Sequence, residues 1–130
     1  MKRVTGIGGI FFKTSDPEKT KEWYSKHLGI ESDKYGGKFE WNDPENDNRK
    51  SYTTWSPFTK KSEYFAPSQK EFMFNYRVDN LDELLKTLEK EGVEIVGKAE
   101  EFDYGKFAWI MDNDGNKIEL WEPKNENLFD

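Results

Sequence analysis

The chain has 130 residues, 34% hydrophobic and 35% charged, which is the size of one domain able to bury its own core. Its formal net charge of −6 argues against a nucleic-acid partner, because binding to a phosphate backbone depends on clustered Lys and Arg. Cysteine is absent, which excludes disulfides, thiolate metal ligands and Cys nucleophiles.

No apolar stretch reaches the length of a signal peptide or of a membrane span. We therefore expect a soluble, cytoplasmic protein with no membrane partner. The aromatic share of 16% favours a core or a pocket built on rings.

The first half of the chain predicts a strand, a helix and three short strands. Residues 4–14 are β-branched and aromatic, as is typical of a strand. Ser15 or Asp16 caps the following helix, Pro17 suits its first turn, and Gly29 suits its end. The remaining strands of this half are expected over residues 30–35, 38–41 and 51–58.

The second half repeats this order. A strand over residues 71–78 leads to Asn80, which caps a second helix that Gly92 ends. The apolar stripe of this helix consists of Leu81, Leu84, Leu85 and Leu88. The strands expected after it cover residues 93–96, 99–104, 107–111 and 116–121.

The two helix starts, Asp16 and Asn80, lie 64 positions apart, about half of the chain. The sequence therefore predicts an α+β fold with two tandem βαβββ units, about residues 4–58 and 71–122. A linker over about residues 59–70 joins them within a single domain, 1–130. Because one such unit leaves a sheet face uncovered, the units should form a curved, incompletely closed mixed sheet around a cleft, with the helices outside.

Period-two alternation divides each strand into two faces. One face is uniformly apolar and suits the helices: Ile10, Phe12, Phe74, Tyr76, Ile118 and Leu120. The other is mixed and should line the concave side: Phe11, Met73, Asn75, Glu119 and Trp121. A mixed lining is typical of a small-molecule cleft, and equally of a half-solvated sheet.

Several motifs together resemble those of the vicinal oxygen chelate superfamily, which includes glyoxalase I, extradiol dioxygenases and bleomycin-resistance proteins. The first runs from Ser15 to Lys19 and is followed by Trp23-Tyr24 and Leu28-Gly29. The second runs from Tyr76 to Asp82, and the most distinctive one from Trp109 to Pro123. The resemblance covers nearly the whole chain and implies the fold far more specifically than the function.

The resemblance also implies where a metal would bind. Metal-dependent members place a His on the first strand of each unit, at positions that fall here on Gly9 and Met73. Their acidic ligand falls on Glu119, and its counterpart in the first unit falls at or near Trp55. A lone carboxylate does not hold a divalent cation, so we expect no metal and no cofactor. His27, the only histidine, lies in the last turn of the first helix, away from the cleft.

The sequence thus predicts a metal-independent, small-molecule-binding protein of the glyoxalase/bleomycin-resistance type. The ligand expected is a basic or aromatic organic compound, and no residue is assigned a catalytic role. The ligand-binding residues expected are Phe11, Trp55, Met73, Asn75, Glu119 and Trp121.

Two alternatives stay open. The first is a glyoxalase-like lyase or isomerase that uses Glu119 as a general base. The second is a dimeric scaffold whose cleft is filled by protein side chains. A homodimer is what the resemblance implies for the partner of this chain.

Overall fold

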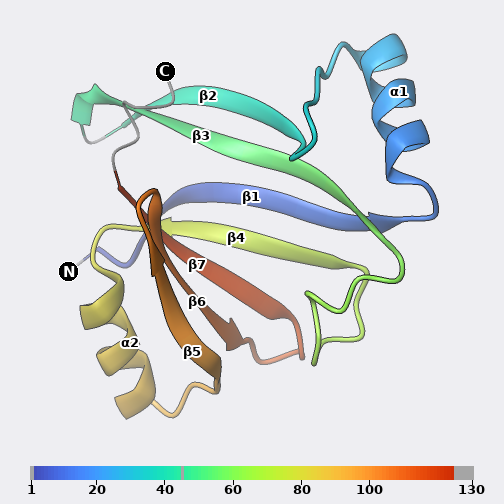
Figure 1. Ribbon diagram of the computed structural model, residues 1–130. Helices are drawn as coiled ribbons and strands as arrows, with labels where there is room; N and C mark the ends of the chain where they lie inside the picture. Colours follow the sequence, from blue (N-terminus) through green and yellow to red (C-terminus); the bar gives the residue numbers. More distant parts are fainter. Residues whose placement is uncertain (1, 45, 125–130) are drawn as a thin grey trace.

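The computed structural model describes residues 2–44 and 46–124. Figure 1 shows two helices lying against a twisted, curved sheet. The elements in chain order are β1 (Val4–Thr14), α1 (Pro17–Leu28), β2 (Gly37–Asp43), β3 (Asn46–Thr59), β4 (Phe72–Val78), α2 (Leu81–Lys90), β5 (Ile95–Phe102), β6 (Gly105–Met111) and β7 (Lys117–Pro123).

All strands belong to one seven-stranded sheet with the order β2-β3-β1-β4-β7-β6-β5. Strands β1 and β4 pair antiparallel at its middle, whereas β1 pairs parallel with β3 and β4 pairs parallel with β7. The sheet is mixed and does not close, because β2 and β5 remain its two edges. The expected α+β class and curved, open mixed sheet are therefore confirmed.

Ile10 and Phe74 lie where the two units meet. They are Cα partners in the β1–β4 ladder and are also 64 positions apart, the period of the repeat. On either side of this pair, Gly9 faces Asn75 and Phe11 faces Met73. This pair therefore lies at the centre of the repeat, and equivalent positions of the two units lie on the neighbouring strands β1 and β4.

The first unit has one strand fewer than expected. Residues 30–36 form only an isolated bridge between Asp33 and Gly36, so the strand predicted over residues 30–35 is wrong. The Asp33 carboxylate accepts a hydrogen bond from the Tyr35 amide, which closes a local turn in place of a ladder. In the second unit, the strands expected at 93–96 and 99–104 form the single strand β5, which contains Gly97 at a φ of 70°.

The capping residues are where the sequence places them. Asp16 caps α1 and accepts a hydrogen bond from the Lys19 amide at 3.1 Å. Asn80 caps α2 and accepts one from the Glu83 amide at 3.2 Å. Gly29 ends α1 at a φ of 70°, a left-handed conformation that glycine adopts without strain.

The two helices differ in how they pack on the sheet. Helix α2 buries Leu81 and Leu84 in a core cluster completed by Val78, Ala108, Ile110 and Leu120. Helix α1 buries none of its residues. Thr20 occupies the repeat position of Leu84, and its hydroxyl shares a hydrogen bond with that of Thr14 at 2.7 Å.

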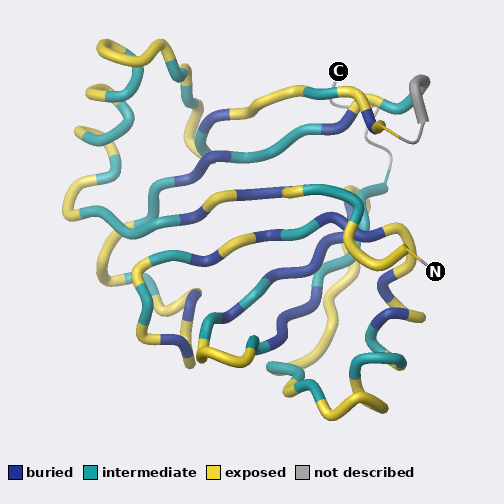
Figure 2. The backbone as a smooth tube through the Cα atoms, turned by 180° about the vertical axis from the view of Figure 1, so that it is seen from behind, coloured by how far each residue is buried: buried dark blue, intermediate teal, exposed yellow. Residues whose placement is uncertain are grey.

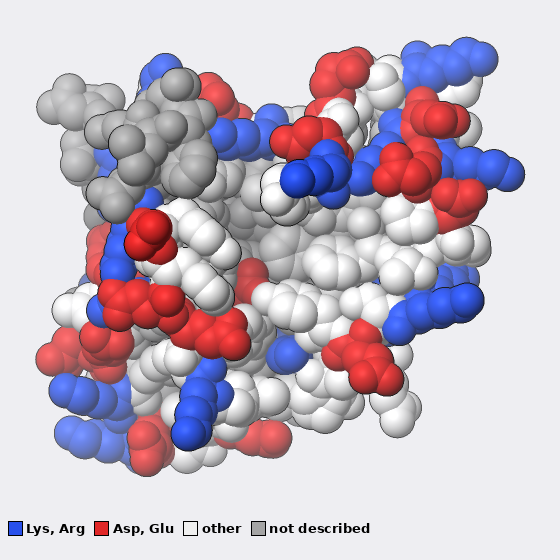
Figure 3. All heavy atoms as spheres, viewed as in Figure 1, with Lys and Arg blue, Asp and Glu red and all other residues white. Residues whose placement is uncertain are grey.

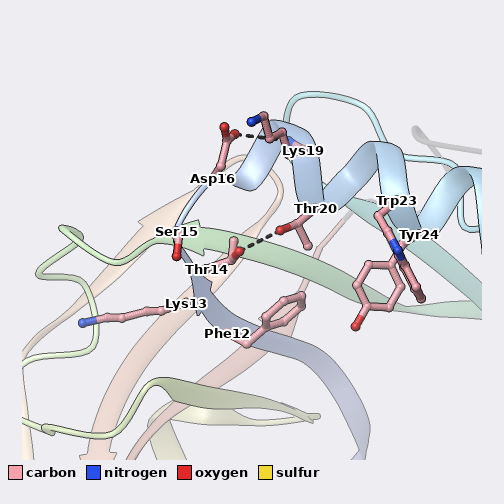
Figure 4. Close-up of a pocket in the computed structure, with 9 residues that line it drawn as sticks. All are labelled: Phe12, Lys13, Thr14, Ser15, Asp16, Lys19, Thr20, Trp23 and Tyr24. Atoms are coloured by element: carbon pink, nitrogen blue, oxygen red, sulfur yellow. Dashed lines mark hydrogen bonds between the residues drawn. The ribbon is translucent and has the colours of Figure 1, made fainter.

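A cavity of about 560 Å³ lies under the first turns of α1, walled by Phe12, Trp23 and Tyr24 (Figure 4).

Figure 2 shows buried residues along the central strands and exposed residues along the outer sides of both helices. On the face shown in Figure 3, charged side chains gather along the margins and uncharged ones cover much of the middle. Neither described helix is long and apolar enough to cross a membrane.

Candidate functional site

The segment between the two units folds onto the concave side of the sheet. Phe65 is fully buried there, in a cluster with Phe11, Met73 and Trp109. The Lys117 ammonium donates a hydrogen bond to the Tyr64 carbonyl at 2.8 Å and so fixes the same segment. The expected linker therefore fills one half of the cleft with its own side chains.

A buried carboxylate marks the boundary of this filled half. Glu119 is 3% exposed, and its Oε1 accepts a hydrogen bond from Asn75 Nδ2 at 2.6 Å. Its Oε2 accepts one from Trp109 Nε1 at 2.9 Å and another from the Tyr64 hydroxyl. Each Glu119 oxygen thus has a partner within the protein, which compensates the cost of burying the charge.

Two groups beside Glu119 have shifted pKa values. Burial, followed by the negative charge of Glu119, raises the pKa of Tyr64 far above its usual range. Burial lowers the pKa of the Lys117 amine, and attraction to Glu119 opposes that shift. The Tyr64 hydroxyl accordingly stays a hydrogen-bond donor throughout the physiological range.

The other half of the cleft is open. It holds a cavity of about 450 Å³ lined by Phe11, Tyr35, Tyr52, Thr54, Asn75, Tyr104, Phe107, Glu119 and Trp121. Phe107 stacks on Trp121 with ring centroids 6.0 Å apart and planes 5° from parallel. Tyr52 approaches Trp121 edge-on at 5.4 Å. The walls are therefore mainly aromatic, with polar groups from Asn75 and Glu119.

Arg77 lies fully buried behind these rings, at 1% exposure. Its guanidinium is 4.8 Å from the Trp121 ring and 5.5 Å from the Trp41 ring. It donates hydrogen bonds to the Tyr52 carbonyl and the Ser51 hydroxyl, each at 3.2 Å. These rings and hydrogen bonds together hold the guanidinium in place.

The structure brings most, but not all, of the predicted site residues together. Four of them line the cavity together: Phe11, Asn75, Glu119 and Trp121. Met73 lies on the same face, but it is fully buried beside Phe65 in the filled half and does not line the cavity.

The prediction that Trp55 lines the cleft is wrong. Its ring contacts Phe12 at 5.3 Å and Tyr24 of α1 at 4.8 Å, on the helix side of the sheet. Its neighbour Thr54 lines the cavity, and successive strand residues point to opposite faces.

The strand register explains this error. In the second unit, Asn75 pairs with Glu119. The residue of the first unit equivalent to Asn75 is Phe11, 64 positions earlier, and it pairs with Ser56. Ser56, and not Trp55, is therefore the counterpart of Glu119 in the first unit. An assignment shifted by one residue changes the face.

Sequence reasoning missed five lining residues: Tyr35, Tyr52, Thr54, Tyr104 and Phe107. Alternation along β3 could have found Tyr52 and Thr54, and Phe107 is the register partner of Trp121. Tyr35 and Tyr104 lie outside the strands, in the 30–36 segment and the β5–β6 turn, where no periodic signal exists.

The donor set does not fit the divalent metal that the family resemblance implies. A Cβ atom at Gly9 would lie 2.6 Å from the Phe11 ring and 2.8 Å from the Thr54 hydroxyl, so the backbone position itself is closed to a larger residue. Met73 offers a thioether covered by Phe65, and the Glu119 oxygens already accept three hydrogen bonds. Within residues 2–44 and 49–124, no three His, Cys, Asp or Glu side chains gather as metal ligands would.

Comparison with known proteins agrees with this architecture. A family model described as the Glyoxalase/Bleomycin resistance protein/Dioxygenase superfamily matches residues 6–120. A structure of methylmalonyl-CoA epimerase in complex with methylmalonyl-CoA and NH4+ superposes with a TM-score of 0.70 at 15% identity, covering 94% of this chain and 96% of that one. Methylmalonyl-CoA epimerase from Mycobacterium tuberculosis gives 0.63 at 20% identity, covering 100% and 95%.

A third similar structure is described as NAD-dependent benzaldehyde dehydrogenase from Legionella pneumophila. It gives a TM-score of 0.57 at 14% identity, covering 89% of this chain and 98% of that one. No curated protein sequence matches the chain. At these identities the structural likenesses show the fold alone.

Proposed function

Because the chain belongs to the Glyoxalase/Bleomycin resistance protein/Dioxygenase superfamily, we propose that it binds a small aromatic molecule in the open half of its cleft, without a metal. One observation carries the proposal. A ring-lined cavity of about 450 Å³ adjoins a buried carboxylate whose oxygens are occupied by the protein's own donors. A cavity of that size, mostly apolar with a few fixed polar groups, suits a small organic ligand.

The proposal can be tested with indoleacetamide, a flat and uncharged probe. Titration calorimetry on chelator-treated protein should detect binding, and Phe107→Ala should weaken it about tenfold by removing the ring stacked on Trp121. Phe39→Ala is the matched control, because Phe39 is 49% exposed on β2 and does not line the cavity. Binding that requires added Zn²⁺ or Ni²⁺, or that Phe107→Ala leaves unchanged, would contradict the proposal.

The enzyme alternative rests on Glu119, which lines the cavity and has the chemistry of a general base. Its three hydrogen-bond donors oppose that role, because a base needs a free lone pair directed at the substrate. Hemithioacetal isomerisation by the wild-type protein is the discriminating assay. Turnover that Glu119→Gln abolishes while indoleacetamide still binds would establish the lyase or isomerase instead.

A homodimer is the second part of the proposal, and the outer face of the sheet supports it. Ile10 is 40% and Phe74 is 39% exposed at the centre of this face, between the two helices. Exposed apolar side chains on neighbouring strands are typical of a surface that another protein covers. Sedimentation velocity should give a dimer at micromolar concentration, and Ile10→Lys should give a monomer; a monomeric wild type would refute this part.

The scaffold alternative has partial support, since Phe65 fills half of the cleft. It would replace the binding function if the protein dimerises but no aromatic probe enters the remaining cavity. The cytoplasmic location expected from the sequence stays part of the proposal.

A further inference from the structure

Three rings that line the cavity each have a cationic side chain over them. Lys38 Nζ lies 4.2 Å from the centroid of the Tyr52 ring. Lys34 Nζ lies 5.0 Å from that of Tyr35, and the Arg77 guanidinium 4.8 Å from that of Trp121. These distances fall within the range of cation–π attraction, so these rings already interact with positive charge.

The register places Lys38 on the β2 side of the cavity and Glu119 on the β7 side. One row of successive Cα partners crosses the sheet between them: Lys38, Thr54, Gly9, Asn75 and Glu119. The Ser56 hydroxyl of β3 donates a hydrogen bond to the Tyr35 carbonyl, so Lys34 also lies on the β2–β3 side. Lys38 pairs with Thr54 across the β2–β3 ladder, so its side chain leaves the sheet on the cavity face. Arg77 pairs with Trp121, two residues along from the pair formed by Asn75 and Glu119. Arg77 therefore lies on the β4–β7 side together with Glu119. Across the strands, the cavity runs from this carboxylate end to an end at β2 and β3 marked by Lys34 and Lys38.

The carboxylate end offers little to a cationic ligand. Glu119 is the one charged residue among those described as lining the cavity, and it is 3% exposed. Its oxygens accept hydrogen bonds from Tyr64, Asn75 and Trp109, and the Lys117 ammonium lies near enough to feel its charge. An incoming ammonium group would have to displace one of these donors.

We propose that the ligand is an aromatic anion of the carboxylate class. Its ring lies beside Phe107 and Tyr52, and its acid group lies at the end marked by Lys34 and Lys38. This inference rests on the proposed binding function and narrows its ligand from a small aromatic molecule to an acidic aromatic one; it replaces the basic ligand that the sequence suggested. A second cation at these rings would be repelled by the one already present, whereas an anion is attracted by it.

Three probes of similar shape but different charge test the inference: indoleacetate, indoleacetamide and tryptamine. By calorimetry, indoleacetate should bind at least about tenfold more tightly than tryptamine, with indoleacetamide between them. In Lys34→Met/Lys38→Met the preference should fall to about twofold or less, because both exposed cations are removed. Added NaCl should weaken indoleacetate binding more than indoleacetamide binding.

Lys86→Met is the control, since Lys86 is exposed on α2 and does not line the cavity. Like each of the other two substitutions, it removes one positive charge, and it should leave the preference for indoleacetate over tryptamine unaltered. Tryptamine binding as tightly as indoleacetate, or a preference that survives the double variant, would overturn this inference and leave the binding function standing. Failure of all three probes to bind would overturn the binding function as well.

Discussion

The Tyr64 hydroxyl donates a hydrogen bond to Glu119 across 55 residues of sequence. It links the segment that joins the two units to the last strand of the sheet. Phe65, the next residue, is buried between Phe11, Met73 and Trp109. The cleft is thereby divided into a filled half, occupied by Phe65, and an open half lined by rings.

Tyr64 should titrate later than an ordinary tyrosine. Its pKa is raised in the folded state by burial and by Glu119, while in the unfolded state it is about 10. Its contribution to stability is therefore complete below pH of about 10 and is lost as the pH rises further, because only the unfolded chain releases the proton there. Phenolate absorbance should show a late-ionising group, which Tyr64→Phe removes.

At neutral pH, Tyr64→Phe should lower the free energy of unfolding by about 1 kcal/mol, because it removes a donor to a buried carboxylate from a residue that is itself 40% exposed. Tyr104→Phe is the control, because Tyr104 is similarly exposed, at 47%, but it is the Tyr64 hydroxyl that donates to Glu119; Tyr104→Phe should change stability by less than about 0.5 kcal/mol. Equal effects of the two substitutions in urea unfolding would contradict the role assigned to Tyr64.

Glu119→Gln should lower the free energy of unfolding by about 2–3 kcal/mol, since a glutamine amide must direct an N–H toward one of the surrounding donors. Urea unfolding measures the change, and Glu89→Gln on the exposed side of α2 provides the control. Adding Asn75→Asp should recover part of the loss, because the aspartate can accept from the new amide. A double variant less stable than Glu119→Gln alone would count against this geometry.

Gly9→Ala should cost about 1–3 kcal/mol, because the new methyl group meets the Phe11 ring at 2.6 Å. In a Phe11→Leu background the same substitution should cost less, since the smaller side chain can move away. A double-mutant cycle in urea compares the two costs. Equal costs in both backgrounds would show that Phe11 does not close this position.

The two helices should respond unequally at equivalent positions. Leu84→Thr should lower the free energy of unfolding by about 2–4 kcal/mol, because Leu84 is 3% exposed in the core under α2. Thr20→Val should change it by about 1 kcal/mol or less, because Thr20 borders the cavity under α1 and loses only its hydrogen bond with Thr14. Thermal or urea unfolding tests both, and similar losses would mean that α1 packs as tightly as α2.

Local patterns determined much of this protein from the sequence alone. Asn80 was identifiable as a cap, and Ser15 or Asp16 as the other, because a short polar side chain can bond to the amides of the next turn; the structure selects Asp16. The faces of β1 and β4 followed from alternation, which is why Phe11 and Asn75 were placed on the cleft. The repeat gave the two-unit plan, since both units carry the same signals in the same order.

Tertiary contacts decided the rest. The face of Trp55 depends on how β3 is aligned with β1, and a shift of one residue reverses it. The positions of Tyr64, Phe65, Tyr35 and Tyr104 depend on where non-periodic segments dock. Docking is set by burial against residues distant in sequence, and a short window of sequence carries no information about such contacts. Composition and period therefore specified the sheet and its helices, whereas strand register and loop packing determined which side chains form the cavity.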